Sequence, residues 1–314
     1  MLGLLARRLA FTIPMLVVVS FCVFSLIVLV PGDPAIALAG ENPDPEQIAA
    51  VRERLGLDDP FLLQFWHWFA DAVRGDLGQS LFSSQSVAEA VFGRLPVTLS
   101  LAGLSLVVAL VIGITVGVVA GMRPGSWVDR VATFAASLGV AVPYFWVGML
   151  LVLLLAINLA VFPAVGYTPI TENPLSWFMH LVLPAAALGL APAAVIARQT
   201  RAAMSGVLQE DYVRTATAKG LPPARVVGKH ALKNAALPVV TAFGLEASRL
   251  IGGTVVIEQL FALPGLGSLA YSAVFARDFP MVQGVLLVVA AMVLLINLIV
   301  DLSYGYFNPR IRQS

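Results

Sequence analysis

The sequence predicts an all-α membrane protein with six transmembrane helices, and three observations predict it. Of the 314 residues, 59% are hydrophobic and only 12% are charged, whereas soluble domains carry about 25% charged residues. Six apolar stretches are each long enough to cross a bilayer, which takes about 20 residues. Lys and Arg are also distributed unevenly between the loops. A soluble core of this size cannot bury so much apolar surface, so lipid must solvate much of it.

The six expected spans follow one another along a single transmembrane domain, residues 1–314. They cover residues 9–31, 97–121, 131–158, 178–197, 236–257 and 280–302. The first span has an alternative interpretation as a signal peptide, because two arginines precede it. Its apolar core of about 20 residues is longer than the 7–15 typical of a signal h-region, so we expect it to be retained. In the second span, Gly113, Gly117 and Gly121 predict close packing against another helix.

The orientation follows from the enrichment of Lys and Arg in short cytoplasmic loops. With the N-terminus inside, thirteen of these residues lie on the cytoplasmic side and five on the outer side. The cytoplasmic set is Arg7, Arg8, Arg123, Arg130, Arg198, Arg201, Arg214, Lys219, Arg225, Lys229, Lys233, Arg310 and Arg312. The outer set is Arg52, Arg54, Arg74, Arg94 and Arg277. We therefore expect both termini in the cytoplasm.

The first outer loop, residues 33–94, is predicted to be a helical extracytoplasmic insertion. Asp44-Pro45 and Asp59-Pro60 are typical of helix starts, and Gly56 and Gly75 are plausible helix ends. The aromatic residues between 61 and 69 suit a helix that lies at the lipid headgroups. Packing against the outer ends of the spans and docking of a partner protein are both compatible with this pattern.

The cytoplasmic loop of residues 198–237 carries the most information. Residues 212–220 predict a helix that ends at a glycine, residues 221–223 predict a turn, and residues 224–234 predict a second, basic helix. Two such helices would form a knob in the cytosol. Anionic lipid would explain its basic charge, but not the small residues Thr215, Ala216 and Gly220, which allow close approach of another surface.

The spans contain few polar groups. Glu246 and Arg249 lie three residues apart on one expected helix, where they either pair with each other or line a polar path across the membrane. Thr241 and Thr254 are further candidates for such a path. An ion-coupled carrier built on these residues is an alternative function, but no inverted three-plus-three repeat supports it.

Several chemistries lack their sequence signatures. There is no phosphate-cradling G-x-x-x-x-G-K-[ST] segment, and His67, His180 and His230 have no metal-ligand spacing. No nucleophile motif supports an intramembrane hydrolase, and the single cysteine, Cys22, cannot form an intrachain disulfide. A net charge of +1 argues against nucleic-acid binding. We expect a non-catalytic chain without metal or cofactor.

The cytoplasmic loop resembles the coupling loop of ATP-binding cassette importer permeases. Their pattern is Glu-Ala-Ala, three residues, Gly, nine residues and Ile-x-Leu-Pro; here Arg214-Thr215-Ala216 precedes Gly220, and Leu237-Pro238 ends the loop. Arg replaces Glu and the loop is longer, as in the dipeptide/oligopeptide/nickel family. Seven other segments resemble the B-type permease of that family: Pro31-Gly32-Asp33-Pro34, Leu55-Gly56-Leu57-Asp58, Arg74-Gly75-Asp76-Leu77-Gly78, Leu95-Pro96-Val97-Thr98-Leu99, Pro264-Gly265-Leu266-Gly267, Asp301-Leu302 and Asn308-Pro309-Arg310-Ile311-Arg312.

The resemblance implies a type I importer permease in the plasma membrane of a bacterium or archaeon. It implies a second, C-type permease, two cytoplasmic subunits that bind ATP and Mg, and an extracytoplasmic solute-binding protein. Dipeptides or oligopeptides are the implied cargo, with nickel, glutathione or an oligosaccharide as alternatives. The implied ATPase-coupling residues are Tyr212, Arg214, Thr215, Ala216, Lys219, Gly220, Arg225 and Lys229. The residues implied to face the binding protein are Pro264, Gly265 and Gly267.

Overall fold

The computed structural model describes residues 2–29, 44–46, 49, 52, 56, 58–83 and 85–307. Within these ranges the only β structure is an isolated bridge between Gln79 and Ser86. Five helices there are long and apolar enough to cross a membrane, or six if one bent pair counts as a span. The expected all-α membrane fold is confirmed.

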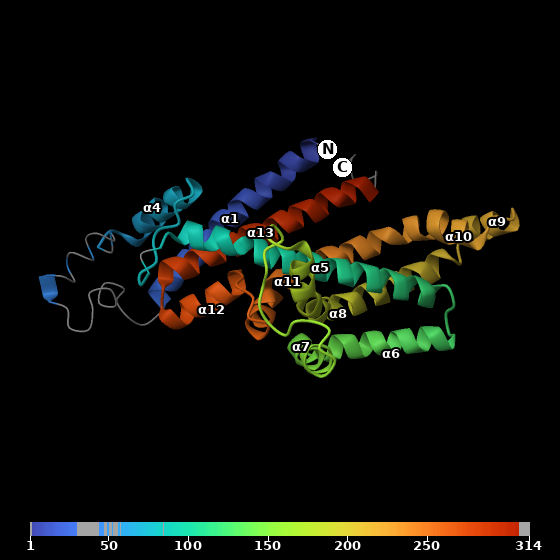
Figure 1. Cartoon of the computed structure of the whole chain (residues 1–314). Helices are drawn as coiled ribbons and strands as arrows, with labels where there is room; N and C mark the ends of the chain where they lie inside the picture. Colours follow the sequence, from blue (N-terminus) through green and yellow to red (C-terminus); the bar gives the residue numbers. More distant parts are fainter. Residues whose placement is uncertain are drawn as a thin grey trace. The chain divides into compact units, whose positions relative to one another are not determined.

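The helices succeed one another along the chain as Figure 1 labels them. Their bounds are α1 (Leu2–Leu29), α4 (Phe61–Val73), α5 (Val87–Gly121), α6 (Trp127–Ala141), α7 (Tyr144–Leu151), the π-helix η1 (Val152–Asn158), α8 (Pro174–Val207), α9 (Asp211–Ala218), α10 (Pro223–Arg225), the π-helix η2 (Val226–Ala231), α11 (Leu232–Leu260), α12 (Leu266–Ala276) and α13 (Phe279–Phe307). Two compact units share them: unit 1 holds residues 97–268 with both chain ends, and unit 2 holds residues 8–96 and 269–294.

Helix α8 lies at the centre of unit 1 and packs against α6, α7 and α11. The expected glycine packing is present, because Gly113, Gly117 and Gly121 of α5 face α8. An added Cβ at these positions would lie 2.8 Å from Ile196, 2.5 Å from Thr200 and 2.8 Å from Met204, respectively. Residue numbers rise together along both helices at this contact, so α5 and α8 are parallel.

Helices α6 and α11 run antiparallel to α8. Along α6, residues 129 and 139 lie beside residues 201 and 194 of α8. Along α11, residues 235 and 253 lie beside residues 204 and 188. Residue numbers therefore fall along α8 as they rise along either neighbour. These directions are the ones that an alternating passage of consecutive spans requires for the helices of unit 1.

The expected third span, residues 131–158, is not one straight helix. Helix α6 ends at Ala141, and α7 continues after Pro143 at an angle of 102°. Val142 has extended backbone angles, as expected for a residue that precedes proline, where the helical conformation is disfavoured. The proline therefore breaks the span near the middle of the apolar stretch.

Other helices extend beyond the expected spans. Helix α5 begins at Val87, ten residues before the expected span, and runs through Pro96. Residues 223–260 form one helical run in which the basic segment continues into α11 through Pro238. The second loop helix that the sequence suggested is thus not separate from the span that follows. The expected element at Asp44-Pro45 and the segments 31–34 and 308–312 lie mostly or wholly outside the described residues.

Unit 2 contains α4, the described helix of the expected insertion. It begins after Pro60, and Gly75 behind it has a left-handed φ of +92°, as the sequence indicated. Phe65 of α4 is buried and its ring centroid lies 5.2 Å from that of Phe21 in α1. Packing against a span therefore explains one face of α4, while Trp66 on its surface is 56% exposed.

A buried aspartate organises a turn in unit 2. Asp278 accepts hydrogen bonds from the Ser80 hydroxyl at 2.5 Å and from the Leu81 N–H at 3.2 Å. Its carboxylate also accepts from the N–H of Met281 in the first turn of α13. One carboxylate thus joins the segment around residue 80 to the start of α13.

Candidate functional site

The coupling segment, residues 211–231, consists of α9, α10 and η2. Helix α9 ends in a Schellman motif: the Gly220 N–H donates to the Thr217 carbonyl at 2.9 Å, and the Leu221 N–H donates to the Ala216 carbonyl at 3.3 Å. Gly220 has φ +78°, a conformation that costs other L-residues about 1–2 kcal/mol. Local sequence therefore fixes where α9 stops.

A small apolar cluster holds α9 in place. Val213 and Ala216 of α9 are buried against Val226 of η2. Partly buried side chains complete the cluster: Val207, Leu208 and Leu221. Because Val207 is the last residue of α8, α9 is fixed to the end of that helix. A second buried set, Met204, Ala231 and Ala235, joins α8 to η2 and α11.

The cluster changes the interpretation of the small-residue face. Ala216 packs within the segment itself, with 7% exposure, so its side chain is not part of an open surface. Thr215 and Gly220 are exposed, and an added Cβ at Gly220 would meet no atom within 4 Å. Space at Gly220 is therefore open, while its positive φ is what requires glycine.

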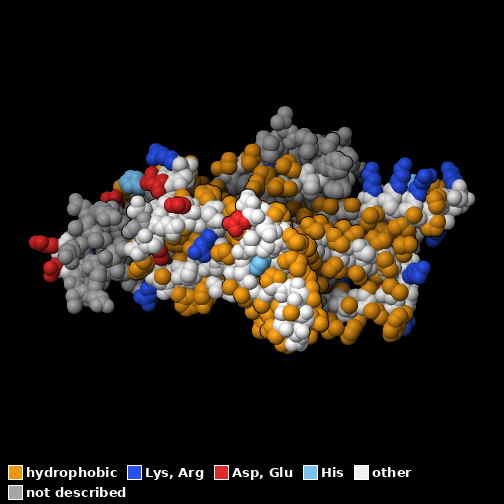
Figure 2. All heavy atoms as spheres, in the orientation of Figure 1, with side chains coloured by type: hydrophobic (Ala, Val, Ile, Leu, Met, Phe, Trp, Pro, Cys, Tyr) orange, Lys and Arg blue, Asp and Glu red, His pale blue; other side chains and the backbone are white. Residues whose placement is uncertain are grey.

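The outer surface of the segment is basic. Arg214, Lys219, Arg225 and Lys229 are all exposed, and Figure 2 shows Lys and Arg side chains gathered where α9 and α10 lie in Figure 1. Arg214 lies 3.6 Å from Asp211, with both side chains open to solvent. This arrangement can bind an acidic protein surface.

Tyr212 connects α9 to the start of α11. Its hydroxyl accepts a hydrogen bond of 2.7 Å from the Asn234 amide, which also donates to the His230 carbonyl. Tyr212 therefore lies where movement of α9 would be passed to α11.

The expected path residues lie on α11 and differ in exposure. Arg249 donates to Glu246 at 3.0 Å; the glutamate side chain is 10% exposed and the arginine side chain 73%. Of the two alternatives that the sequence left open, the pair is formed. Thr241 is exposed, whereas Thr254 is buried and donates to the Ile251 carbonyl. Of the four candidate path residues, Arg249 and Thr241 are thus the exposed ones.

The turn after α11 is held by a residue that sequence inspection missed. Glu258 is fully buried; it accepts from the Thr98 hydroxyl at 2.8 Å and from the Ser268 N–H at 2.9 Å. Thr98 in turn accepts from the Leu266 N–H at 2.8 Å. We call these four residues the glutamate clasp.

The clasp explains the glycines in Pro264-Gly265-Leu266-Gly267. A Cβ at Gly265 would meet the Glu258 carboxyl group, and one at Gly267 would meet Val255 and Glu258. Both glycines are buried, and Pro264 is the exposed residue of the expected binding-protein-facing set. The sequence signal that could have revealed the clasp is the position of Glu258, one residue beyond the expected span of residues 236–257.

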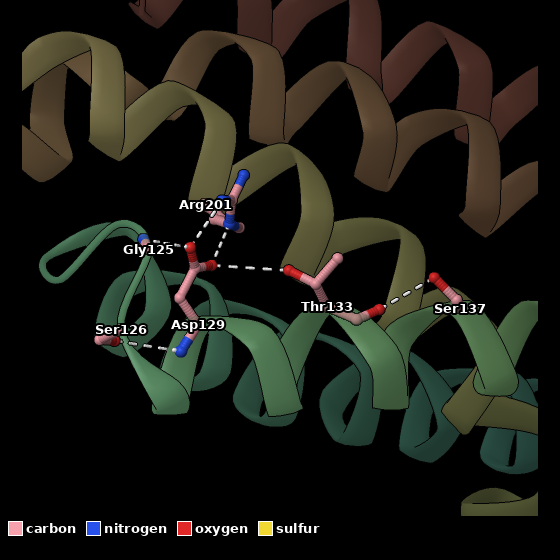
Figure 3. A network of polar contacts seen from close by, with 6 residues as sticks. All are labelled: Gly125, Ser126, Asp129, Thr133, Ser137 and Arg201. Atoms are coloured by element: carbon pink, nitrogen blue, oxygen red, sulfur yellow. Dashed lines mark hydrogen bonds and ion pairs between the residues drawn. The ribbon is translucent and has the colours of Figure 1, made fainter.

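A second polar network joins α6 to α8 (Figure 3). The Arg201 guanidinium donates two hydrogen bonds to the Asp129 carboxylate, one from Nε and one from Nη2 at 2.7 Å. Asp129 also accepts from the Gly125 N–H at 2.8 Å, and Ser126 caps α6 by accepting from the Asp129 N–H. The bidentate geometry fixes the N-terminal end of α6 on α8.

Among the residues that the structure places, no three His, Cys, Asp or Glu side chains gather as a metal site. The arrangement offers an exposed basic segment, a buried clasp and a paired intramembrane carboxylate. It suits transmission of movement between helices.

Comparisons with known proteins define the class. Residues 113–313 match the family described as "Binding-protein-dependent transport system inner membrane component", and residues 1–102 match its N-terminal counterpart. The chain belongs to this family of multi-pass membrane permeases. Membership implies, in general terms, work with a binding protein and an ATPase.

Two relatives are similar over their whole length. The chain is 44% identical over 314 residues to a putative peptide transport system permease protein of Brucella abortus, covering 100% of both chains. It is 43% identical over 314 residues, again 100% of both, to the glutathione transport system permease protein GsiC of Escherichia coli K12. The MetNI methionine ABC transporter, in an inward-facing conformation, matches with TM-score 0.56 and 20% identity over 69% of this chain and 96% of that one. This last likeness shows a shared fold.

Proposed function

We propose that this chain is a transmembrane permease subunit of an ATP-driven importer that moves dipeptides or oligopeptides into the cytoplasm. The observation that carries the proposal is the 44% identity, over the full length, to a peptide transport system permease protein. The chain supplies the membrane passage, and ATP hydrolysis belongs to other subunits.

The proposed assembly has four kinds of component around this chain. They are a C-type permease, two cytoplasmic ATPases that bind ATP and Mg, an extracytoplasmic solute-binding protein and the lipid of a bacterial or archaeal plasma membrane. Both termini are proposed to lie in the cytoplasm, which the thirteen-to-five distribution of Lys and Arg supports.

The coupling segment is the proposed contact with the ATPases. Its exposed cations favour an acidic partner surface. Its buried clusters include the end of α8 and the start of α11, so a displacement of α9 is passed to both helices. ATPase closure would in this way open the path between the permeases.

The substrate path is proposed to be wide and wet. A zwitterionic peptide carries a charge at each end, and burial of an unpaired charge is costly. Arg249 and Thr241 are the exposed candidates on α11, which is a sparse lining. Selectivity therefore belongs to the separate binding protein, and the permease binds its cargo weakly.

Glutathione import is a second candidate function. It is favoured by the 43% full-length identity to a glutathione transport system permease protein. The same fold and the same coupling segment serve both candidates, so the difference is in cargo alone.

The test is uptake by proteoliposomes that contain this chain, its second permease and its ATPases, with the binding protein outside and ATP inside. Labelled dipeptide, pentapeptide and glutathione are compared, and matched vesicles without ATP are the control. We expect ATP-dependent accumulation of a peptide. Accumulation of glutathione alone would select the second candidate, and uptake driven by an ion gradient without ATPases would contradict both.

A further inference from the structure

Unit 1 has an apolar groove between α5, α6, α7 and α8, which we call the α6–α8 groove. It is an open groove of about 400 Å³, within the size range of sites that hold small molecules. Its walls include Ile112, Ala132, Ala135, Gly139, Ala191 and Ala194. Alanine and glycine on both facing helices keep it open, because larger side chains would fill it.

The groove continues toward two arginines. A smaller hollow shares Val116, Ala132, Ala136 and Ala197 with it and is also lined by Arg198 and Arg201. The other end is bordered by Tyr144, Trp146 and Val147 of α7. Since α7 turns away from α6 by 102°, it lies across the groove rather than along it. The groove thus has one basic end and one apolar end.

Its length matches one leaflet of a bilayer. From Ala132 to Ala141, where α6 ends, the helix advances by about 14 Å at a rise of 1.5 Å per residue. The hydrocarbon core of a bilayer is about 30 Å thick, so half of it is about 15 Å. An acyl chain that enters at the basic end reaches α7 near the bilayer midplane.

The two arginines differ in their partners. Arg201 is engaged by Asp129 through two hydrogen bonds. Arg198 is exposed, and within the described part of the chain no hydrogen bond or ion pair engages it. A single unpaired guanidinium at the end of an apolar groove is suited to a phosphate group, which it can bind with two donors.

We propose that the α6–α8 groove binds one acyl chain of an anionic phospholipid from the cytoplasmic leaflet, with its phosphate at Arg198. The cytoplasmic position of Arg198 is the orientation assumed in the proposed function. The site goes beyond cargo transport, because its ligand is a lipid of the surrounding membrane and not the imported substrate.

The experiment uses the assembled transporter in vesicles of phosphatidylcholine with about 20% phosphatidylglycerol, where part of the phosphatidylglycerol carries a diazirine near the end of one acyl chain. After illumination, mass spectrometry identifies the labelled peptides. We expect label on α6, α7 and α8, and at least a threefold lower yield when the probe has a phosphatidylcholine headgroup.

Two pairs of variants test the two ends. Ala135→Trp fills the groove from an exposed position, and its control is Phe134→Trp, whose site does not line the groove. We expect a fivefold or greater loss of label for the first and none for the second. Arg198→Gln is expected to abolish the headgroup preference, and Arg198→Lys to retain it.

Unchanged labelling in Ala135→Trp, or an unchanged headgroup preference in Arg198→Gln, would overturn the proposal. So would loss of the second permease from purified Ala135→Trp, because the groove would then be a protein interface. Arg198→Gln changes an exposed side chain and is expected to fold even if Ala135→Trp does not. Labelling is independent of cargo, so failure here is distinct from failure of the peptide-import proposal.

Discussion

The two ends of α11 are stabilised in opposite ways. Before it, the coupling segment is held by three buried apolar residues and a left-handed glycine, and its charged side chains face solvent. After it, the glutamate clasp places a carboxylate at 0% exposure with hydroxyl and backbone donors around it. The first end keeps its polar groups available to a partner, and the second uses them internally. Docking and anchoring are therefore separated along one helix.

The comparison predicts its largest effect at Glu258. Glu258→Ala leaves the Ser268 N–H and the Thr98 hydroxyl without their buried acceptor, at a cost of about 3 kcal/mol. We expect a strongly lowered Tm in detergent and loss of transport. Glu258→Gln keeps the shape of the side chain and one acceptor oxygen, so its Tm should lie between those of the wild type and of Glu258→Ala. Equal Tm for wild type and Glu258→Ala would show that the clasp anchors nothing.

The next effect is expected at Gly265. Gly265→Ala places a methyl group against the Glu258 carboxyl and should destabilise by about 2 kcal/mol, as overpacking does. Gly252→Ala is the control, because Gly252 lies in α11 with no atom near its added Cβ. Alanine at that helical position should be neutral or stabilising. Thermal unfolding of the two variants side by side measures the difference.

At the other end, Gly220 separates backbone strain from partner contact. Gly220→Ala should cost about 1 kcal/mol because of the positive φ, and Gly220→Asn should cost less, because Asn tolerates this conformation. Gly220→Arg adds bulk and is expected to abolish stimulation of the ATPases. ATP hydrolysis is measured with and without binding protein. If the Gly220→Arg and Gly220→Asn variants support equal ATP hydrolysis, no partner surface lies close to Gly220.

The smallest effect on stability is expected at Arg214. Its pair with Asp211 is exposed, and such pairs contribute about 0.5 kcal/mol or less. Arg214→Ala should leave Tm within about 1 °C and still weaken ATPase association, with a stronger loss at low salt. Co-purification at two salt concentrations, with Arg214→Lys as the control, measures this. A large fall in Tm would place Arg214 with the anchoring groups instead.

Sequence reasoning succeeded where the determining contacts are local. The apolar spans follow from composition, and the end of α9 follows from Gly220 and the turn behind it. It failed where distant residues decide: the burial of Ala216 depends on Val207 and Val226. Glu258 escaped notice because a carboxylate at the edge of an apolar stretch resembles a boundary residue until Thr98, 160 positions earlier in the chain, is placed beside it.

The bend in residues 131–158 was missed for a different reason. The length of an uncharged stretch shows that it can cross the membrane, but it does not show whether the helix bends. Pro143 lies inside the stretch, and no charged neighbour marks a boundary there. Proline within an apolar helix is often tolerated, since Pro96, Pro184, Pro192 and Pro238 all lie inside helices of this protein. Only the extended backbone at Val142 distinguishes the break.

The contact of three glycines on α5 with α8 has a mechanical consequence. Ile196, Thr200 and Met204 of α8 each occupy the space left by one glycine, so a slide of one helix along the other would drive these side chains into larger neighbours. The next register that fits is a full repeat of four residues, about 6 Å away. Smaller strokes must carry α5 and α8 together, and a force applied at α9 therefore reaches both helices without slippage.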